Sequence, residues 1–368
     1  MQQLGERRDS RDKSLDVMKG IGIILMVAGH SGSPFTSIIY LFHMALFFAI
    51  SGYLWNDRNA ESVKSLLLYG KRKMSSLYVP FVAITIVFIL LHNVFLHIGI
   101  YTEVPLFLEL MPSAHDKLIT PYSIEEMLIK AIKAILFSCN EQLGGALWFL
   151  RTLFLISIGH AVSKYIVLHW RYGRIYEKIT VFILTAALLL IVHCKVQLPN
   201  EIVRCCIAYA AYLLGTVYKC AEKKLLDCRT MRIWGVSGAV VLLLLNQIGT
   251  IEIVTGEITS LLFFILATTA GWGVIRLLAK TMKGVLLGVV AYIGERSLWV
   301  VMLHFLSFKT VSLVYILVTK QDYLWLAKFP TMQVEPYLWI PYLLVGVILP
   351  LVFEYGWSQV TSLLKSRS

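Results

Sequence analysis

The sequence predicts an all-α fold, a polytopic membrane bundle of about ten transmembrane helices with both termini cytoplasmic. Of its 368 residues, 58% are hydrophobic and only 15% are charged. The apolar residues fall in runs long enough to cross a bilayer, which takes about 17 to 25 residues per helix. Composition and run length together predict an integral membrane protein with several spans.

The expected spans follow one another with mostly short connections. They begin near Asp16, Phe35, Leu77, Ala146, Ile179, Ile202, Ile233, Ile258, Leu287 and Tyr337. The first span is not a secretory signal peptide, because it continues through a short polar turn into the second without a cleavage site of small residues. We expect one integral membrane domain over residues 1–368, with residues 1–13 as a cytoplasmic tail.

Lysine and arginine are unevenly shared between the two sets of connections. Twenty-four of the 34 basic residues lie in the tails and in alternate connections. Short cytoplasmic loops carry such an excess, so these segments are expected in the cytoplasm and the protein in the inner membrane of the cell. This sidedness, with attraction to anionic membrane lipids, explains the net charge of +12. No nucleic acid partner is expected.

Residues 99–145 form the one long connection on the outer side. Within them, Ser123 to Phe137 has the apolar periodicity of an amphipathic helix that lies at the membrane interface. A surface lid without chemistry and a role in binding substrate are equally compatible with this pattern.

Three polar residues in the first two spans are candidates for function, because charged or imidazole side chains are costly in hydrocarbon. Lys19 and His30 are eleven residues apart, which at about 100° per residue places them within about 20° of one helix face. They are expected roughly 16 Å apart along the axis. His43 lies roughly 12 Å into the second span, too deep for an imidazole without a role.

The segments RDKSLDVMKGIGIILMVAGH and FHMALFFAISGY, which carry these residues, resemble the membrane-bound acyltransferase 3 family. In that family a basic residue precedes a histidine with ten residues between them, as Lys19 precedes His30. The run GGALWFLRTLF at Trp148 and the run YIGERSLWVVMLHF ending at His304 resemble two later blocks. Within this sequence we find no fused soluble domain of the kind some relatives carry, and Arg151 has no match in the resemblance.

The resemblance implies transfer of an acetyl or other short acyl group from cytoplasmic acyl-CoA to a hydroxyl of a glycan or lipid-linked sugar. Acetyl-CoA is the commonest donor in the family and succinyl another. The acceptor is open among exopolysaccharide, lipid-linked oligosaccharide, lipopolysaccharide, peptidoglycan and small metabolites. No metal is expected, since no spacing of ligands indicates a metal site.

The two catalytic candidates are His30 and His43. A neutral His30 suits a general base that takes the proton of the acceptor hydroxyl. It also suits a nucleophile that carries the acyl group, and the sequence does not choose between these roles. His43 either positions the thioester carbonyl or supports His30, and His304 is expected to line the same cavity.

Lys19, Arg151 and Arg296 are the candidates for binding the donor. Lys19 either attracts coenzyme A phosphates or extends to the inner interface. Arg151 suits a donor phosphate or an acidic acceptor, with Glu141 as a conceivable partner.

The supporting candidates are Asp16, Trp148, Glu295 and His304. Asp16 either orients Lys19 or caps the helix. Glu295 and Arg296 form an interfacial pair at the cytoplasmic entry of the ninth span, where they also suit contact with the nucleotide of the donor.

The alternative reading is a polytopic transporter or flippase for a glycan or small solute. Buried basic and imidazole residues suit such a pathway too. The sequence shows no inverted repeat and no matched pair of spans broken by glycine or proline, which disfavours it. Use of an acyl thioester separates the two classes.

Overall fold

The computed structural model describes residues 13–110, 116–138, 141–196, 198–225 and 227–366. Residues 1–12, which hold nearly all of the expected tail, lie outside this set, as do parts of the outer segment 99–145. The chain divides into two compact units, which are described separately. Unit 1 comprises Met1–Met26, Ser37–Trp55 and Val181–Ser297. Unit 2 comprises Val27–Thr36, Asn56–Thr180 and Leu298–Ser368.

The prediction of a polytopic helical bundle is confirmed. Among the described residues, the only strands are the two-residue β1 (Ile251–Glu252) and β2 (Glu257–Ile258), which pair in an antiparallel hairpin. Nine helices in the described ranges are long and apolar enough to cross a membrane. The 18-residue helix α2 (Lys13–His30) carries the first expected span and holds three charged side chains.

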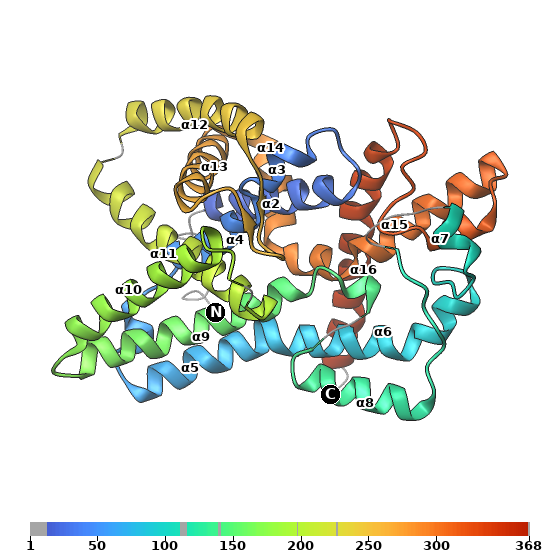
Figure 1. The fold of residues 1–368 in the computed structure, drawn as a ribbon, viewed down its shortest axis with the longest axis horizontal. Coiled ribbons are helices and arrows are strands. Elements are labelled where there is room, and N and C mark those ends of the chain that lie inside the picture. The colour runs from blue at the N-terminus through green and yellow to red at the C-terminus, as the bar shows by residue number, and fades with distance from the viewer. Residues whose placement is uncertain (1–12, 111–115, 139–140, 197, 226, 367–368) are drawn as a thin grey trace. The chain divides into compact units, whose positions relative to one another are not determined.

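Unit 1 is built around two closely packed helix pairs (Figure 1). Its helices are the first part of α2, α4 (His43–Tyr53), the last part of α10 (Gly173–Val192), α11 (Asn200–Leu225), α12 (Cys228–Ile248), α13 (Leu261–Thr281) and α14 (Gly284–Glu295). The two closely packed pairs are α4 with α11 and α12 with α13. In the α4–α11 pair, Gly52 faces the backbone carbonyl of Tyr212, and Gly215 faces that of Ala49. A Cβ at either glycine would overlap that carbonyl, so the two backbones approach as small residues allow in membrane helices.

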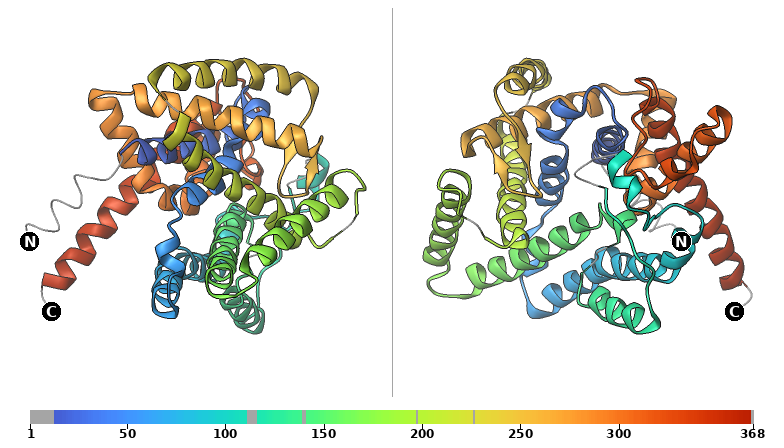
Figure 2. Two further views of the ribbon diagram at one scale, coloured as in Figure 1. Left: turned by 90° about the vertical axis from the view of Figure 1, so that its left-hand side faces the viewer. Right: turned by 45° about the vertical axis from the view of Figure 1, so that its right-hand side comes forward.

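Unit 2 holds the outer segment and the last two spans. Its elements are η1 (Asp57–Ala60), α5 (Val63–Lys73), η2 (Met74–Tyr78), α6 (Val79–His97), α7 (Leu106–Leu110), α8 (Ile124–Ile135), η3 (Gln142–Gly144), α9 (Trp148–His169), the start of α10, α15 (Ser297–Thr319), η4 (Tyr323–Ala327) and α16 (Trp339–Ser366). The short α3 (Thr36–Tyr40) passes from unit 2 into unit 1. Helix α8 packs against α6, and the right-hand view in Figure 2 shows the two side by side.

Two span boundaries differ from the sequence prediction. The third span was expected to begin near Leu77, but the helix starts at Val63 and continues through the π-helical turn η2 to His97. The ninth was expected to begin near Leu287, but α14 ends at Glu295 and α15 starts at Ser297. The break falls at Arg296. Two residues earlier, Gly294 packs so closely on α2 that a Cβ there would overlap the backbone carbonyl of Asp16.

The amphipathic helix predicted between Ser123 and Phe137 is confirmed as α8. It starts with a capping box, in which the Ser123 hydroxyl accepts from the Glu126 N–H and the Glu126 carboxylate accepts from the Ser123 N–H. The bond from the Ser123 N–H holds the pKa of Glu126 below its ordinary value. The large side chains Ile124, Leu128 and Ile132 are exposed along one face, as an interfacial helix requires.

Candidate functional site

His30 and His304, 274 positions apart in sequence, lie together in unit 2. Their rings stack with centroids 5.5 Å apart and planes inclined by 26°. His30 is the last residue of α2 and is half-buried, whereas His304 in α15 is fully buried. The structure therefore brings two of the sequence-predicted site residues into one place.

The hydrogen bonds of His304 fix which of its nitrogens is basic. Its Nδ1 donates to the carbonyl oxygens of Val300 and Val301, at 2.9 and 3.1 Å. Because a carbonyl oxygen only accepts, the proton of the neutral ring is on Nδ1 and the lone pair is on Nε2. That Nε2 is buried and has no hydrogen-bond partner within the described part of the chain. An unpaired buried acceptor costs free energy, so it is a candidate for accepting a proton from substrate or from a neighbouring group.

Aromatic side chains surround the histidine pair. The ring of Phe305 lies 5.1 Å from His30 and 4.0 Å from His304, measured between centroids. Phe305 also packs against Phe329, with ring centroids 4.8 Å apart, and contacts Gly145 just before α9. The pair is therefore in contact with the connections around Gly145 and Phe329 as well as with the helices.

His304 lies inside a helix that is long and apolar enough to cross a membrane. His304 is the eighth of 23 residues in α15, so fifteen residues follow it in the helix, or roughly 22 Å. The turn that begins at Ser31, directly after His30, is also buried at Ser31 and Ser33. Non-helical backbone at such depth occurs where protein or a water-filled cavity surrounds it.

His43 lies in unit 1 and is buried at 4% exposure. Its Nδ1 donates to the carbonyl of Ile39 at 2.9 Å, which leaves the lone pair on Nε2, as in His304. Its ring stacks on Tyr40 with centroids 5.1 Å apart. The burial fits the predicted depth of His43, and its role in catalysis stays a prediction.

Two of the three candidates for binding the donor, Lys19 and Arg296, lie in unit 1, whereas Arg151 lies in unit 2. Lys19 donates to Asp16 at 3.3 Å, which favours the orienting role of Asp16, while Lys19 itself is half-buried. Glu295 and Arg296 form the expected ion pair at 3.5 Å, and the guanidinium lies over the Tyr292 ring at 3.8 Å. The close contact of Gly294 with the Asp16 backbone brings the start of α2 and the end of α14 together.

Trp148 and Arg151 lie in the first turn of α9, in unit 2. Three residues apart, they share a face of that helix, and both are half-buried. Gly145, shortly before them, lies against Phe305 of the histidine site. Glu141, expected as a conceivable partner of Arg151, binds His92 at 2.9 Å and Tyr122 at 2.8 Å.

One buried charged cluster was not predicted. Arg276 of α13 is 3% exposed and donates to both carboxylate oxygens of Glu222, at 3.1 and 2.8 Å, and to Ser14 at 2.6 Å. Tyr53 and Trp272 also donate to Glu222. No local sequence pattern links Arg276 to Glu222, 54 positions earlier, so the sequence alone gives no signal of this cluster.

A buried lysine and a buried histidine also join outer segments to helices. Lys309 of α15 donates to the carbonyls of Leu326 and Lys328, at 2.9 and 2.7 Å. His92 of α6 is 1% exposed and binds both Glu141 and the carbonyl of Thr120. Within the described ranges, no group of three histidine, cysteine, aspartate or glutamate side chains is arranged to hold a metal ion.

Comparison with known proteins agrees with the resemblance seen in the sequence. A family model described as an acyltransferase domain matches residues 12–355, nearly the whole chain. A 59-residue stretch is 46% identical to nodulation protein NolL of Sinorhizobium fredii (strain NBRC 101917 / NGR234). That stretch covers 12% of this chain and 16% of the relative. No solved structure matches the chain.

Proposed function

Because the chain belongs to the acyltransferase family that matches residues 12–355, we propose that it moves an acetyl or other short acyl group from acyl-CoA to a hydroxyl of a glycan or lipid-linked sugar. The donor is expected from the cytoplasm and the acceptor from the outer side or the membrane plane. The proposal includes a location in the inner membrane and a role in the O-acylation of polysaccharide.

The observation that carries the proposal is the stacked pair of His30 and His304 with an unpartnered Nε2 on His304. In the transfer, an imidazole nitrogen takes the proton of the acceptor hydroxyl as its oxygen attacks the thioester carbonyl. A new C–O bond forms, the C–S bond breaks, and the proton passes to the departing thiolate of coenzyme A. His30 serves as this base or, alternatively, carries the acyl group in a covalent step.

The second imidazole has a natural place in this scheme. With its own proton held by the carbonyls of Val300 and Val301, His304 has its lone pair free to stabilise a proton on or near His30. His43, buried in unit 1, is proposed to position the thioester. Water excluded by Phe305 and Phe329 would otherwise hydrolyse the acyl group.

Charges at the start of α2 suit the donor phosphates. Lys19 is held by Asp16 yet remains partly exposed, and Arg296 at the end of α14 is likewise partly exposed. Phosphate is bound by such flexible or forked cations. Arg151 and Trp148 at the start of α9 are proposed for the acidic part of either substrate.

The test is binding and turnover of labelled acetyl-CoA by the purified protein in detergent. His30→Ala should lower turnover by about a thousandfold while binding persists, since a base or nucleophile is lost. Lys19→Ala should weaken binding by about tenfold, as expected when one charge-assisted bond is removed. His97→Ala, an exposed histidine at the end of α6, is the matched control and should change neither.

A folded wild-type protein that neither binds nor cleaves acyl-CoAs of several chain lengths would contradict the proposal. The transporter would then become the better explanation of the buried polar residues.

A further inference from the structure

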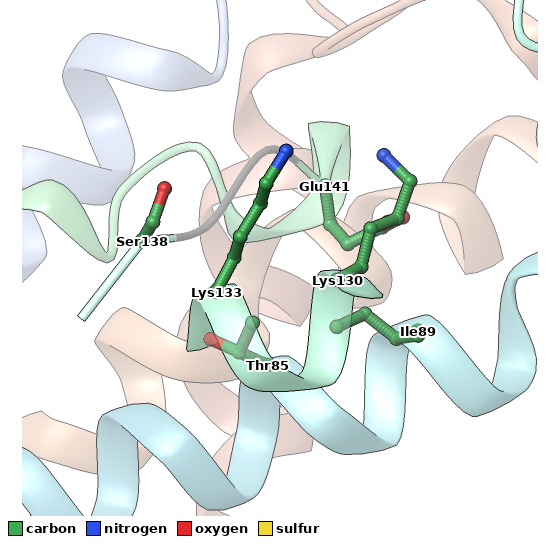
Figure 3. A pocket seen from close by; sticks show the side chains of 6 residues that line it. All are labelled: Thr85, Ile89, Lys130, Lys133, Ser138 and Glu141. Atoms are coloured by element: carbon green, nitrogen blue, oxygen red, sulfur yellow. The ribbon is translucent and has the colours of Figure 1, made fainter. Parts of the chain in front are cut away.

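The outer segment of unit 2 forms a hollow with α6 that is separate from the histidine site. The hollow is shallow, with an enclosed volume of about 10 Å³ below its opening to solvent, and it is lined by Thr85, Ile89, Lys130, Lys133, Ser138 and Glu141. Figure 3 shows that Lys130 and Lys133 extend from α8 in the same direction, beside the segment that carries Glu141. Two ammonium groups therefore stand at one opening.

The single acidic side chain of this lining is already neutralised. Glu141 binds Nδ1 of His92, while Nε2 of the same ring donates to the carbonyl of Thr120. Wherever the shared proton lies, Glu141 and His92 together carry no net charge. Glu126, one turn before Lys130, is engaged in the capping box with Ser123. The charge presented by the hollow is therefore positive.

Lys130 is held in place by its neighbours. Its ammonium lies 4.3 Å from the centroid of the Tyr122 ring, a cation–π distance. Tyr122 in turn stacks on His92 with centroids 3.3 Å apart and donates its hydroxyl to Glu141 at 2.8 Å. A cation on such a rigid support loses little conformational freedom when it binds an anion.

Thr85 supplies an independent sign of a missing ligand. Its side chain is 1% exposed, lines the hollow, and has an Oγ1 with no hydrogen-bond partner among the residues that the structure describes. A buried hydroxyl normally finds a partner, often the carbonyl one helical turn earlier. Two ammonium groups and an unused hydroxyl together make a set of donors suited to an oxyanion.

The exposed apolar face of α8 indicates on which side that oxyanion arrives. Leu128 and Ile132 are exposed, and at 100° per residue Lys130 lies opposite their mean direction and Lys133 about 120° from it. If the apolar face lies in the membrane interface, the lysines face the aqueous side rather than the lipid. This favours an acceptor over a lipid headgroup.

We propose that this hollow binds a carboxylate or phosphate of the acceptor, so that the acceptor is an acidic glycan. The inference rests on the proposed transferase function and gives the acceptor class. Carboxylate and phosphate share the same donor chemistry here, so the two are separated by experiment.

The experiment measures binding of fluorescent oligomers to the full-length protein in phosphatidylcholine nanodiscs. The probes are a trimer of galacturonic acid, an oligomer of glycerol phosphate and the neutral maltotriose. At least one acidic oligomer should bind about tenfold tighter than maltotriose and lose this advantage at high salt. Whichever acidic oligomer binds more tightly identifies the bound anion as a carboxylate or a phosphate.

The variants assign the binding to the hollow. Lys130→Gln with Lys133→Gln should weaken binding of the acidic oligomer by about tenfold or more, because two charge-assisted contacts are lost. Thr85→Val, nearly equal in size, should weaken it by about threefold through loss of the hydroxyl. Lys117→Gln, an exposed lysine of the same outer segment outside the lining, is the control and should leave binding unchanged.

Cleavage of acyl-CoA, measured on the same samples, separates failure of this inference from failure of the proposed transferase function. Wild type that cleaves acyl-CoA, but binds acidic and neutral oligomers equally or is unaffected by the lysine variants, overturns the inference alone. Phosphatidylglycerol that stays bound to the purified wild-type protein without any oligomer, and is lost from the lysine variants, would assign the hollow to lipid. That result would also overturn the inference. Wild type that binds acidic oligomers but cleaves no acyl-CoA overturns the proposed function and with it the acceptor role.

Discussion

The buried Arg276 cluster of unit 1 and the histidine pair of unit 2 are both polar groups among membrane helices, but they differ in how well they are paired. Arg276 and Glu222 bind each other twice, and Tyr53, Trp272 and Ser14 complete their bonds. His304 instead keeps a buried Nε2 that has no hydrogen-bond partner in the described ranges. The comparison teaches that the state of hydrogen bonding, more than burial of a polar residue, separates scaffold from chemistry.

The largest effect on folding is expected from Arg276→Ala. It leaves Glu222 as a buried carboxylate without its cation, which should cost about 3–5 kcal/mol of unfolding free energy. The measurement is thermal or denaturant unfolding of the purified protein in detergent. Lys280→Gln, exposed near the end of the same helix, should leave stability unchanged.

The double variant Arg276→Leu with Glu222→Leu refines this prediction. With both charges removed, no unpaired ion remains, so it should be more stable than Arg276→Ala. An Arg276→Ala protein that unfolds like wild type but has lost acyl transfer would break the comparison, because the cluster would then be part of the chemistry.

A smaller effect, on activity alone, is expected from His304→Leu. Loss of the second imidazole should lower acyl transfer by about a hundredfold, as for removal of a group that assists proton transfer. Stability should stay equal to wild type or rise, since an unpaired buried nitrogen is replaced by an apolar group. Acyl transfer at the wild-type rate by a folded His304→Leu protein would remove His304 from the site.

The smallest effect is expected at the start of α8. Hydrogen bonds from Ser123 in the folded state lower the pKa of Glu126 from its ordinary value of 4.5. The ionised carboxylate therefore stabilises the helix at pH values above 4.5, and this contribution is lost as the pH falls through the lower, folded-state pKa. Glu126→Gln should therefore increase hydrogen exchange in α8 slightly at pH 7, and the difference should disappear in acid. A difference that persists below the folded pKa would show that charge is not involved.

The sequence was sufficient for much of the fold because apolar length and basic sidedness are local signals. It predicted the amphipathic α8 from periodicity alone. It missed that the helix of the third span extends back to Val63, because α5 is too polar to look membrane-spanning. It missed the division between α14 and α15, since the break at Arg296 accompanies the contact of Gly294 with α2, and such tertiary contacts leave no periodic pattern.

The candidate site was predictable only in its composition. Resemblance to a family identified His30 and His304 as important, but their stacking depends on how two distant helices pack. The same holds for Arg276 with Glu222 and for His92 with Glu141, where each partner looks like an ordinary interfacial or loop residue. Among these pairs, only geometry distinguishes the unpaired nitrogen of His304.

The reciprocal contact of Gly52 and Gly215 with backbone carbonyls has a consequence for how this protein tolerates change. Each glycine faces main chain on the opposing helix, which no rotamer can move aside, so even alanine would force α4 and α11 apart. In a library of all single substitutions, these two sites should accept almost nothing, while Gly159 and Gly288, with open space around them, should accept many residues. The face of α4 that packs on α11, which carries Ala49 and Gly52, would thus be among the least mutable parts of the chain.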